Sequence, residues 1–468
     1  MIGIVGLTLL LVLATAATAL EPIVIKGQRL FGAVSGAPFI VEGVNYYPRP
    51  NAGVNDKNSV DFFTDDQSAI WLPHVAAFKA LGVNVVRIYS VDPTQPHDKF
   101  MCALASAGIY VMIELASSCR GCEITSEAYP ACYPPSLKAR GQEIIAAFSK
   151  YNNVLGFSAG NEINHRVKDI KSNAPCQKMP IGIAVADADR SANALYYSCR
   201  TDPTDILEDV EWYGLNVYLQ CDPKATTAVE GPGYTELKTQ LASYKMVAPV
   251  ILTEFGCLNK GFPTIDGYAA QRTWVQVPWI RKDPDALAGG VAFEFSTENA
   301  NSMADAPYPF TSHGAQNYGL GYFSPATCNH GSVPCVYNDM PNFKSLAQQY
   351  ASRTTNALAS KDQYTALRTQ PPSCPTGFAA LKSITWAPDA APNLQCPNYT
   401  QVAVCPGESP GAGHLDGTNS TITPMPLILL TTAPASMAPA RTTPVASAAT
   451  SGVVALSLVL LGAMALDF

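Results

Sequence analysis

The sequence predicts an α/β fold in which eight parallel strands close into a (β/α)8 TIM barrel. Between about residues 36 and 300, short apolar runs alternate with amphipathic segments of helical length, the pattern of a parallel sheet covered by helices. Eight such runs occur, which is the number that this barrel requires. They are FIVEGVNYY (39–47), VNVVRIYS (83–90), IYVMIELA (109–116), NVLGFSAG (153–160), MPIGIAVAD (179–187), WYGLNVYLQ (212–220), APVILTEFG (248–256) and GGVAFEFS (289–296).

Smaller elements are expected around this barrel. Residues 22–35 precede the first barrel strand and predict a short N-terminal hairpin. Apolar spacing indicates helices over 137–150 and 267–281, and a last helix near 342–359. We therefore assign residues 21–360 to one (β/α)8 barrel domain. Residues 361–410, rich in Cys and Pro with little periodicity, form a small C-terminal appendix.

Both ends of the chain predict processing and export. Residues 1–20 form an apolar run that ends in small residues, as a signal peptide does. Residues 411–452 are a stalk rich in Ser, Thr, Pro and Ala, and 453–468 form a hydrophobic tail. This order is typical of a GPI-anchor signal. A single-pass membrane tail is the alternative, but no Lys or Arg follows the apolar run. We expect a secreted cell-surface protein held by GPI on the outer leaflet of the plasma membrane and in the cell wall.

Charge and cysteine content agree with secretion. The 468 residues carry a formal net charge of −7, which disfavours nucleic acid as a partner because such binding depends on Lys and Arg. Most of the thirteen cysteines should pair in an oxidising compartment. Sequons at Asn398 and Asn419 predict N-glycosylation. The CRGC at 119–122 lacks the context of a redox or zinc motif, and no metal or cofactor is expected.

The segment GFSAGNE at 156–162 contains two competing catalytic signatures. Its first part matches G-x-S-x-G, the nucleophile elbow of serine hydrolases, with Ser158 as nucleophile. An elbow needs a helix packed on the sheet directly after the serine, whereas the polar NEINHRVKDIK follows here. We therefore interpret Ser158 as a packing residue within a strand.

Glu162 belongs to the second signature, an Asn-Glu pair at the end of an apolar run, as in many sugar-cleaving barrels. It follows the fourth apolar run, and Glu254 lies at the end of the seventh, so both should lie at the carboxyl end of the barrel, where barrel enzymes have their active sites. Glycoside hydrolysis needs such a pair, one carboxyl as acid and one as nucleophile, about 5–5.5 Å apart in retaining enzymes. The alternative for either residue is a structural ion pair.

These motifs resemble those of a known family. GNE at 160–162 and TEFG at 253–256 are similar to the retaining β-glycosidases on (β/α)8 barrels. Over roughly residues 22–350 the chain resembles the β-1,3-glucanosyltransferases of fungal and related cell walls, glycoside hydrolase family 72. The segments that carry the resemblance are FIVEGVNYYP, LGVNVVRIYSVDPTQPHD, AGIYVMIELA, GNEIN, YGLNVYLQC, TEFGC and GGVAFEFS, in the family's order.

The resemblance implies a role for each matching residue. Glu162 would be the general acid/base and Glu254 the nucleophile, while Asn161 would hold the 2-hydroxyl of the donor sugar. Cys221 and Cys257 would form a disulfide beside the mouth of the barrel. The expected substrate-binding residues are Tyr46, Tyr89, Asn161, Tyr218, Glu114 and Phe293. For each tyrosine, packing at the barrel rim remains an alternative.

The chain departs from the family at several positions. Tyr47 replaces a usual Gln, Glu114 a usual Asp, and Phe293 and Phe295 usual tyrosines. The family's partner for Cys102 is absent near residues 69–71, which makes Cys102 a candidate for the unpaired thiol. None of these changes removes a catalytic carboxylate.

The resemblance implies a retaining enzyme that cleaves β-1,3-glucan and transfers the new reducing end to the non-reducing end of another β-1,3-glucan, in cell-wall assembly and remodelling. Donor and acceptor glucan chains would be its partners. A hydrolytic β-glucanase or β-mannanase on the same barrel, and a catalytically silent wall-binding protein, remain alternatives. Preference for transfer rests on the resemblance alone.

Overall fold

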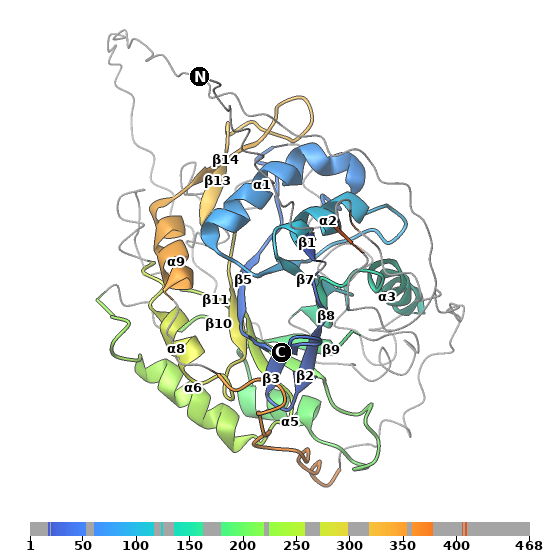
Figure 1. The fold of residues 1–468 in the computed structure, drawn as a ribbon, viewed down its shortest axis with the longest axis vertical. Coiled ribbons are helices and arrows are strands. Elements are labelled where there is room, and N and C mark those ends of the chain that lie inside the picture. The colour runs from blue at the N-terminus through green and yellow to red at the C-terminus, as the bar shows by residue number, and fades with distance from the viewer. Residues whose placement is uncertain are drawn as a thin grey trace, which may run out of the picture. The chain divides into compact units, whose positions relative to one another are not determined.

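The fold contains the predicted closed barrel of eight parallel strands (Figure 1). Its strands follow one another around the barrel in the order β10-β11-β12-β5-β6-β7-β8-β9. They are β5 (Val41–Asn45), β6 (Val85–Ile88), β7 (Tyr110–Glu114), β8 (Val154–Asn161), β9 (Ile181–Ala186), β10 (Trp212–Val217), β11 (Val250–Phe255) and β12 (Gly289–Ala292). The computed structural model describes residues 17–18, 20–52, 60–116, 123–124, 135–161, 179–219, 224–257, 272–297, 318–352, 358–377, 405 and 408–409.

Nearly every residue of these strands is buried, which explains their continuous apolar runs. Side chains alternate between the two faces of a strand. Val85 and Met112, two residues before Arg87 and Glu114, therefore share a face with them. Both belong to a small apolar cluster that also includes Leu30 of the N-terminal sheet. A larger cluster contains Val86, Val111 and the buried faces of the helices. The barrel thus has an apolar layer inside, below the level of Arg87 and Glu114.

Glycine makes room for one large side chain in this inner layer. A Cβ at Gly182 would lie 2.1 Å from the Trp212 ring on the neighbouring strand. Trp212 belongs to the small apolar cluster and is 2% exposed. No side chain larger than hydrogen fits at position 182 while Trp212 keeps this position.

Helices surround the strands in Figure 1. Those with described bounds are α1 (Ser68–Leu81), α2 (Asp98–Ser106), α3 (Pro135–Phe148), α5 (Arg190–Ser198), α6 (Pro232–Ser243), α8 (Gln276–Lys282) and α9 (Pro341–Ala351). α3 confirms the helix expected at 137–150, and α9 begins one residue before the expected last helix and ends at Ala351. Among the described residues, no helix is both long and apolar enough to cross a membrane.

Short strands form the remaining sheets. The expected N-terminal hairpin is present as β2 (Ile23–Lys26) and β3 (Arg29–Gly32), with β4 (Pro38–Phe39) as a third antiparallel strand. β13 (Gly321–Ser324) and β14 (Val336–Asp339) form a second hairpin, and a disulfide joins Cys328 to Cys335 between them. β1 (Ala17–Thr18) pairs with β15 (Glu408–Ser409).

Two further disulfides attach the C-terminal appendix to the barrel domain. Cys199, after α5, pairs with Cys374. Cys102, on α2, pairs with Cys405. The expectation that Cys102 is the unpaired thiol was wrong, because its partner comes from 303 residues downstream rather than from the neighbouring helix. The described residues do not test the proposed boundaries of the appendix, stalk and tail.

Candidate active site

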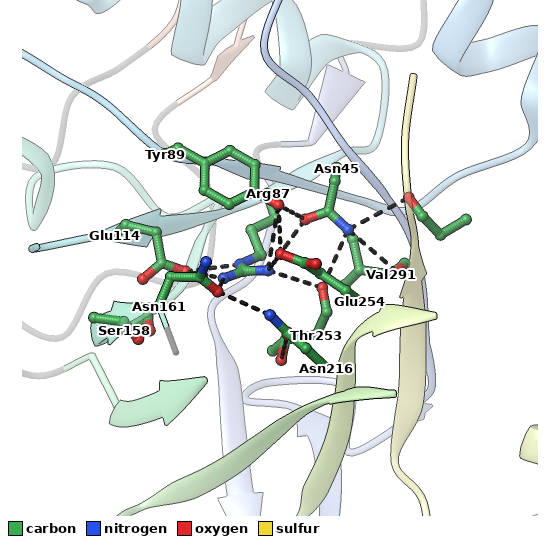
Figure 2. A network of polar contacts seen from close by, with 12 residues as sticks. Asn45, Arg87, Tyr89, Glu114, Ser158, Asn161, Asn216, Thr253, Glu254 and Val291 are labelled. Atoms are coloured by element: carbon green, nitrogen blue, oxygen red, sulfur yellow. Dashed lines mark hydrogen bonds and ion pairs between the residues drawn. The ribbon is translucent and has the colours of Figure 1, made fainter. Parts of the chain in front are cut away.

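Polar side chains from six barrel strands meet at the carboxyl end of the barrel (Figure 2). Each occupies one of the last two positions of its strand, and the group is Asn45, Arg87, Glu114, Asn161, Asn216 and Glu254. In a barrel of parallel strands these ends share one face, so residues far apart in sequence become neighbours. These six polar side chains therefore form one group at the mouth of the barrel.

Arg87 is the centre of this group. Its Nε and Nη2 both contact Glu114 Oε1, at 2.7 and 2.6 Å. Its Nη1 donates to Glu254 Oε1 and to the Thr253 carbonyl, each at 3.0 Å, and Nη2 donates to Asn161 Oδ1 at 2.8 Å. The Arg87 side chain is fully buried. Burial alone would lower its pKa, but the carboxylates of Glu114 and Glu254 raise it. Arg87 therefore stays charged and connects both carboxylates to Asn161.

Glu254 accepts hydrogen bonds at both carboxylate oxygens. Besides Arg87, the Tyr89 hydroxyl lies 2.9 Å from Oε1, and the Tyr218 hydroxyl donates to Oε2 at 2.7 Å. Burial raises the pKa of Tyr89 and Tyr218 well above 10, and the negative charge of Glu254 raises both further. Both tyrosines are therefore neutral donors at physiological pH. Such donors favour the ionised form of a buried carboxylate.

Asn161 is held by a chain of polar side chains. Its Oδ1 accepts from Arg87 Nη2 and, at 2.9 Å, from Asn216 Nδ2. The Thr253 hydroxyl donates to Asn216 Oδ1 at 2.8 Å. Asn216 and Thr253 are buried, whereas Asn161 is partly exposed. Asn161 thus has a fixed orientation at the mouth of the barrel.

Three aromatic rings lie beside Glu254. Tyr218 is 6.2 Å from Phe293 and 5.1 Å from Tyr318 between ring centroids, and Phe293 and Tyr318 are 5.5 Å apart. Arg272 supports two of them, since it donates to the carbonyls of Phe293, at 2.6 Å, and Tyr318. Flat apolar rings of this kind can pack against the C–H faces of a sugar.

The structure brings most of the predicted site residues together. Glu254, Tyr89, Asn161 and Glu114 lie in one hydrogen-bond network, with Tyr218 and Phe293 beside it. Glu162, Cys221, Asn398 and Asn419 lie outside the described residues. Their predicted roles stay predictions, as does the pairing of Cys221 with Cys257, which is buried.

Tyr46 lies in the hydrophobic core. It is fully buried, its hydroxyl is 2.8 Å from His74 Nδ1, and its ring packs against Phe78 and Phe295. Because Asn45 points into the barrel, the next side chain points outward toward α1. Tyr46 thus has a packing position, which was the alternative for each of the predicted tyrosines. It is not included in the site proposed below.

Ser158 has the structural role expected of it. It lies within β8, is 1% exposed, and donates through Oγ to the Gly160 carbonyl at 2.8 Å. The Ser158 hydroxyl thus donates to its own strand, whereas a nucleophilic serine would donate to a general base.

The sequence did not single out Arg87, Asn45, Asn216, Thr253, Arg272 or Tyr318. The first four are polar residues near the carboxyl end of an apolar run, and that position was the available signal. Arg87 in VNVVRIYS was the clearest case, because a buried cation requires an anionic partner. Among the described residues, no group of three His, Cys, Asp or Glu side chains could hold a metal ion.

Comparison with known proteins identifies the family of the chain. The model of the glucanosyltransferase family, glycoside hydrolase family 72, matches residues 12–303, more than half of the chain. The chain belongs to this family. Its members are transglycosylases named 1,3-β-glucanosyltransferases, and the barrel is shared with solved members.

Individual relatives are distant. The chain is 30% identical over 305 residues to 1,3-beta-glucanosyltransferase GAS4 of Saccharomyces cerevisiae, covering 60% of each. It is also 30% identical over 305 residues to gas4 of Schizosaccharomyces pombe, covering 61% of this chain and 62% of that protein. The match therefore spans about three fifths of these relatives' length. The structure of Saccharomyces cerevisiae Gas2p in complex with laminaripentaose superposes with a TM-score of 0.58 at 24% identity, covering 77% of this chain and 74% of that chain.

Proposed function

We propose that this chain is a retaining 1,3-β-glucanosyltransferase. It would cleave a β-1,3-glucan and join the new reducing end to the non-reducing end of a second β-1,3-glucan. The observation that supports this most is the Glu254 carboxylate, which Arg87, Tyr89 and Tyr218 hold at the carboxyl end of β11. An ionised carboxylate in a fixed orientation is what the nucleophile of a retaining enzyme needs.

The proposed reaction has two displacements. Glu254 attacks C1 of the donor sugar while Glu162 protonates the departing glucan oxygen, which leaves a glucosyl ester on Glu254. Glu162 then takes the proton from the 3-hydroxyl of an acceptor glucan, whose oxygen attacks C1 and releases Glu254. If water replaces the acceptor, the result is hydrolysis.

The substrate class rests on family membership and on the shape of the site. Relatives carry the name 1,3-beta-glucanosyltransferase, and one solved relative holds laminaripentaose. Tyr218, Phe293 and Tyr318 offer rings for a neutral sugar beside Glu254. We further propose that the protein acts at the cell surface through a GPI anchor. Release from cells by a phospholipase that cleaves phosphatidylinositol would support the anchor, and retention would contradict it.

Mass analysis of the products from one defined laminari-oligosaccharide tests the reaction. Products longer than the starting oligosaccharide are expected. Only shorter products would indicate a hydrolytic glucanase, and unchanged starting material would indicate a binding protein. Glu254→Gln and Glu162→Gln should each reduce the rate more than about 100-fold. Glu211→Gln is the matched control, since Glu211 precedes the opposite end of β10 and is exposed.

A further inference from the structure

The orientation of the Asn161 amide is determined by its neighbours. Arg87 carries only N–H groups toward Asn161 and cannot accept a hydrogen bond. The atom of Asn161 that lies 2.8 Å from Arg87 Nη2 must therefore be the oxygen. The other amide atom, Nδ2, is then the one directed away from Arg87.

The orientation of the Asn216 amide is determined in the same way. Because Asn161 Oδ1 can only accept, the Asn216 atom 2.9 Å from it must be the nitrogen. Asn216 then presents Oδ1 to the Thr253 hydroxyl, which donates to it at 2.8 Å. Asn216 is 2% exposed and Thr253 is fully buried, so water does not compete strongly for these hydrogen bonds.

A rotated Asn161 amide would meet two N–H donors. Its own NH2 group would then face Arg87 Nη2 and Asn216 Nδ2 with no acceptor between them. Such an arrangement would break the hydrogen bonds from Arg87 and Asn216 to Asn161 and would leave their buried N–H groups without this acceptor. Within the part of the chain that the structure describes, Nδ2 has no protein acceptor, and the Asn161 side chain is partly exposed at the barrel mouth.

We propose that Asn216 and Thr253 are positioning residues that fix Asn161 as a hydrogen-bond donor, so that the site selects a donor sugar whose 2-hydroxyl oxygen accepts from Asn161 Nδ2. This inference rests on the proposed function, because it concerns the sugar that Glu254 attacks. Asn216 and Thr253 do not touch the sugar and act only through Asn161.

Three variants, one of them a control, test the two residues. Asn216→Asp replaces the donor Nδ2 with an oxygen that repels Asn161 Oδ1, while the side chain keeps its size. Thr253→Val removes the hydroxyl with little change of shape, and Thr253→Ser retains it as the control. Each variant is assayed with a laminari-oligosaccharide and with its analogue that carries 2-deoxyglucose at the cleaved linkage. Thermal unfolding identifies any variant that fails to fold.

The expected result is a loss that depends on the 2-hydroxyl. Asn216→Asp should lower kcat/KM for the hydroxylated donor about 10- to 100-fold, and Thr253→Val about 3- to 10-fold. Both should leave the 2-deoxy donor nearly unchanged, and Thr253→Ser should behave as the wild type. In an Asn161→Ala background, Asn216→Asp should cost nothing more. Equal losses on both donors, or equal behaviour of Thr253→Val and Thr253→Ser, would overturn the inference.

Binding to the Glu254→Gln protein separates this inference from the proposed reaction. Calorimetry compares its affinity for the two oligosaccharides with and without the Asn216→Asp change. If the wild-type protein cleaves neither compound but Asn216→Asp removes the preference for the 2-hydroxyl, the proposed reaction fails and the inference holds. If the affinities show no such preference in either protein, the inference fails even where the wild-type protein is active.

Discussion

Arg87 contacts Glu114, Glu254 and Asn161 with one planar guanidinium group. A lysine could keep the charge but could not reach all three partners, because its single ammonium lacks the forked geometry. Arg87→Lys should therefore lower kcat/KM on a laminari-oligosaccharide at least about 100-fold and reduce the free energy of unfolding by about 2 kcal/mol. Steady-state kinetics and urea unfolding measure the two effects.

Arg281→Lys is the control for this variant. Arg281 forms a similarly buried ion pair with Glu42, near the start of β5, at 2.5 Å. We expect the Arg281→Lys variant to lose a similar amount of stability but to keep its activity. If the two variants lose activity to the same extent, the loss in Arg87→Lys reflects stability alone and Arg87 has no specific role in the reaction.

Tyr218 supplies a neutral donor to Glu254 Oε2. Tyr218→Phe removes that donor, so the carboxylate takes up a proton at higher pH than before. We expect kcat/KM to fall about 10-fold or more, and the acidic limb of the pH–activity profile to move to higher pH. Tyr213→Phe on the same strand is the control, because Tyr213 is buried against Tyr197. An unmoved acidic limb would argue against this role of Tyr218.

At the scale of elements, the eight strands were predictable because each is buried on both faces and reads as one apolar run. The partners of Glu254 were not predictable, because the sequence does not show whether a polar side chain in such a run points into the barrel or outward. Arg87 points inward together with Val85, a relation that needs the register of β6 against β5 and β7. The buried position of Tyr46 was not predictable for the same reason, since one position along the strand exchanges the two faces.

The loop after β11 depends on a glycine. Gly256 has φ +134°, and a Cβ there would lie 2.6 Å from Arg272 Nη2, the atom that holds the Phe293 carbonyl. Gly256→Ala should therefore displace Arg272 and the rings of Phe293 and Tyr318. We expect a loss of about 2–4 kcal/mol in unfolding free energy and a raised KM for the oligosaccharide.

Gly108→Ala is the comparison for Gly256→Ala. Gly108 has φ +78°, but a Cβ there would meet nothing within 4 Å. This variant should show only the backbone cost of about 1–2 kcal/mol, with an unchanged KM. Equal stability and KM for the two variants would mean that Arg272 does not hold the aromatic rings.

For the whole molecule, long-range disulfides join parts that the sequence could not match. Thirteen cysteines allow many pairings, and no periodicity links Cys102 to Cys405 or Cys199 to Cys374. The appendix is thereby bonded to α2 and to the segment after α5. Closing chain segments of this length restricts the unfolded state more than a local bridge such as Cys328–Cys335 does.

The stability of the barrel domain should also depend on pH through His74, which is 3% exposed beneath Tyr46, Phe295, Phe323 and Tyr337. Burial, together with the smaller effect of the charge of His330, lowers the pKa of His74 to about 3. A histidine whose pKa is lower in the folded than in the unfolded state stabilises the fold above the unfolded value of about 6.5. That contribution is lost progressively as the pH falls from about 6.5 toward 3.

Urea unfolding between pH 7 and pH 4.5 tests this dependence. The wild-type protein should lose about 2–3 kcal/mol of unfolding free energy over this range through His74. His74→Gln keeps a polar partner for the Tyr46 hydroxyl, 2.8 Å away in the wild type, but cannot take up a proton. The variant should be less stable than the wild type at pH 7, and its unfolding free energy should fall less steeply below pH 6.5. His97→Gln is the control, since His97 is buried as well but is paired with Asp61 at 2.8 Å. Parallel curves for the wild type and His74→Gln would show that acid destabilises the fold through other groups.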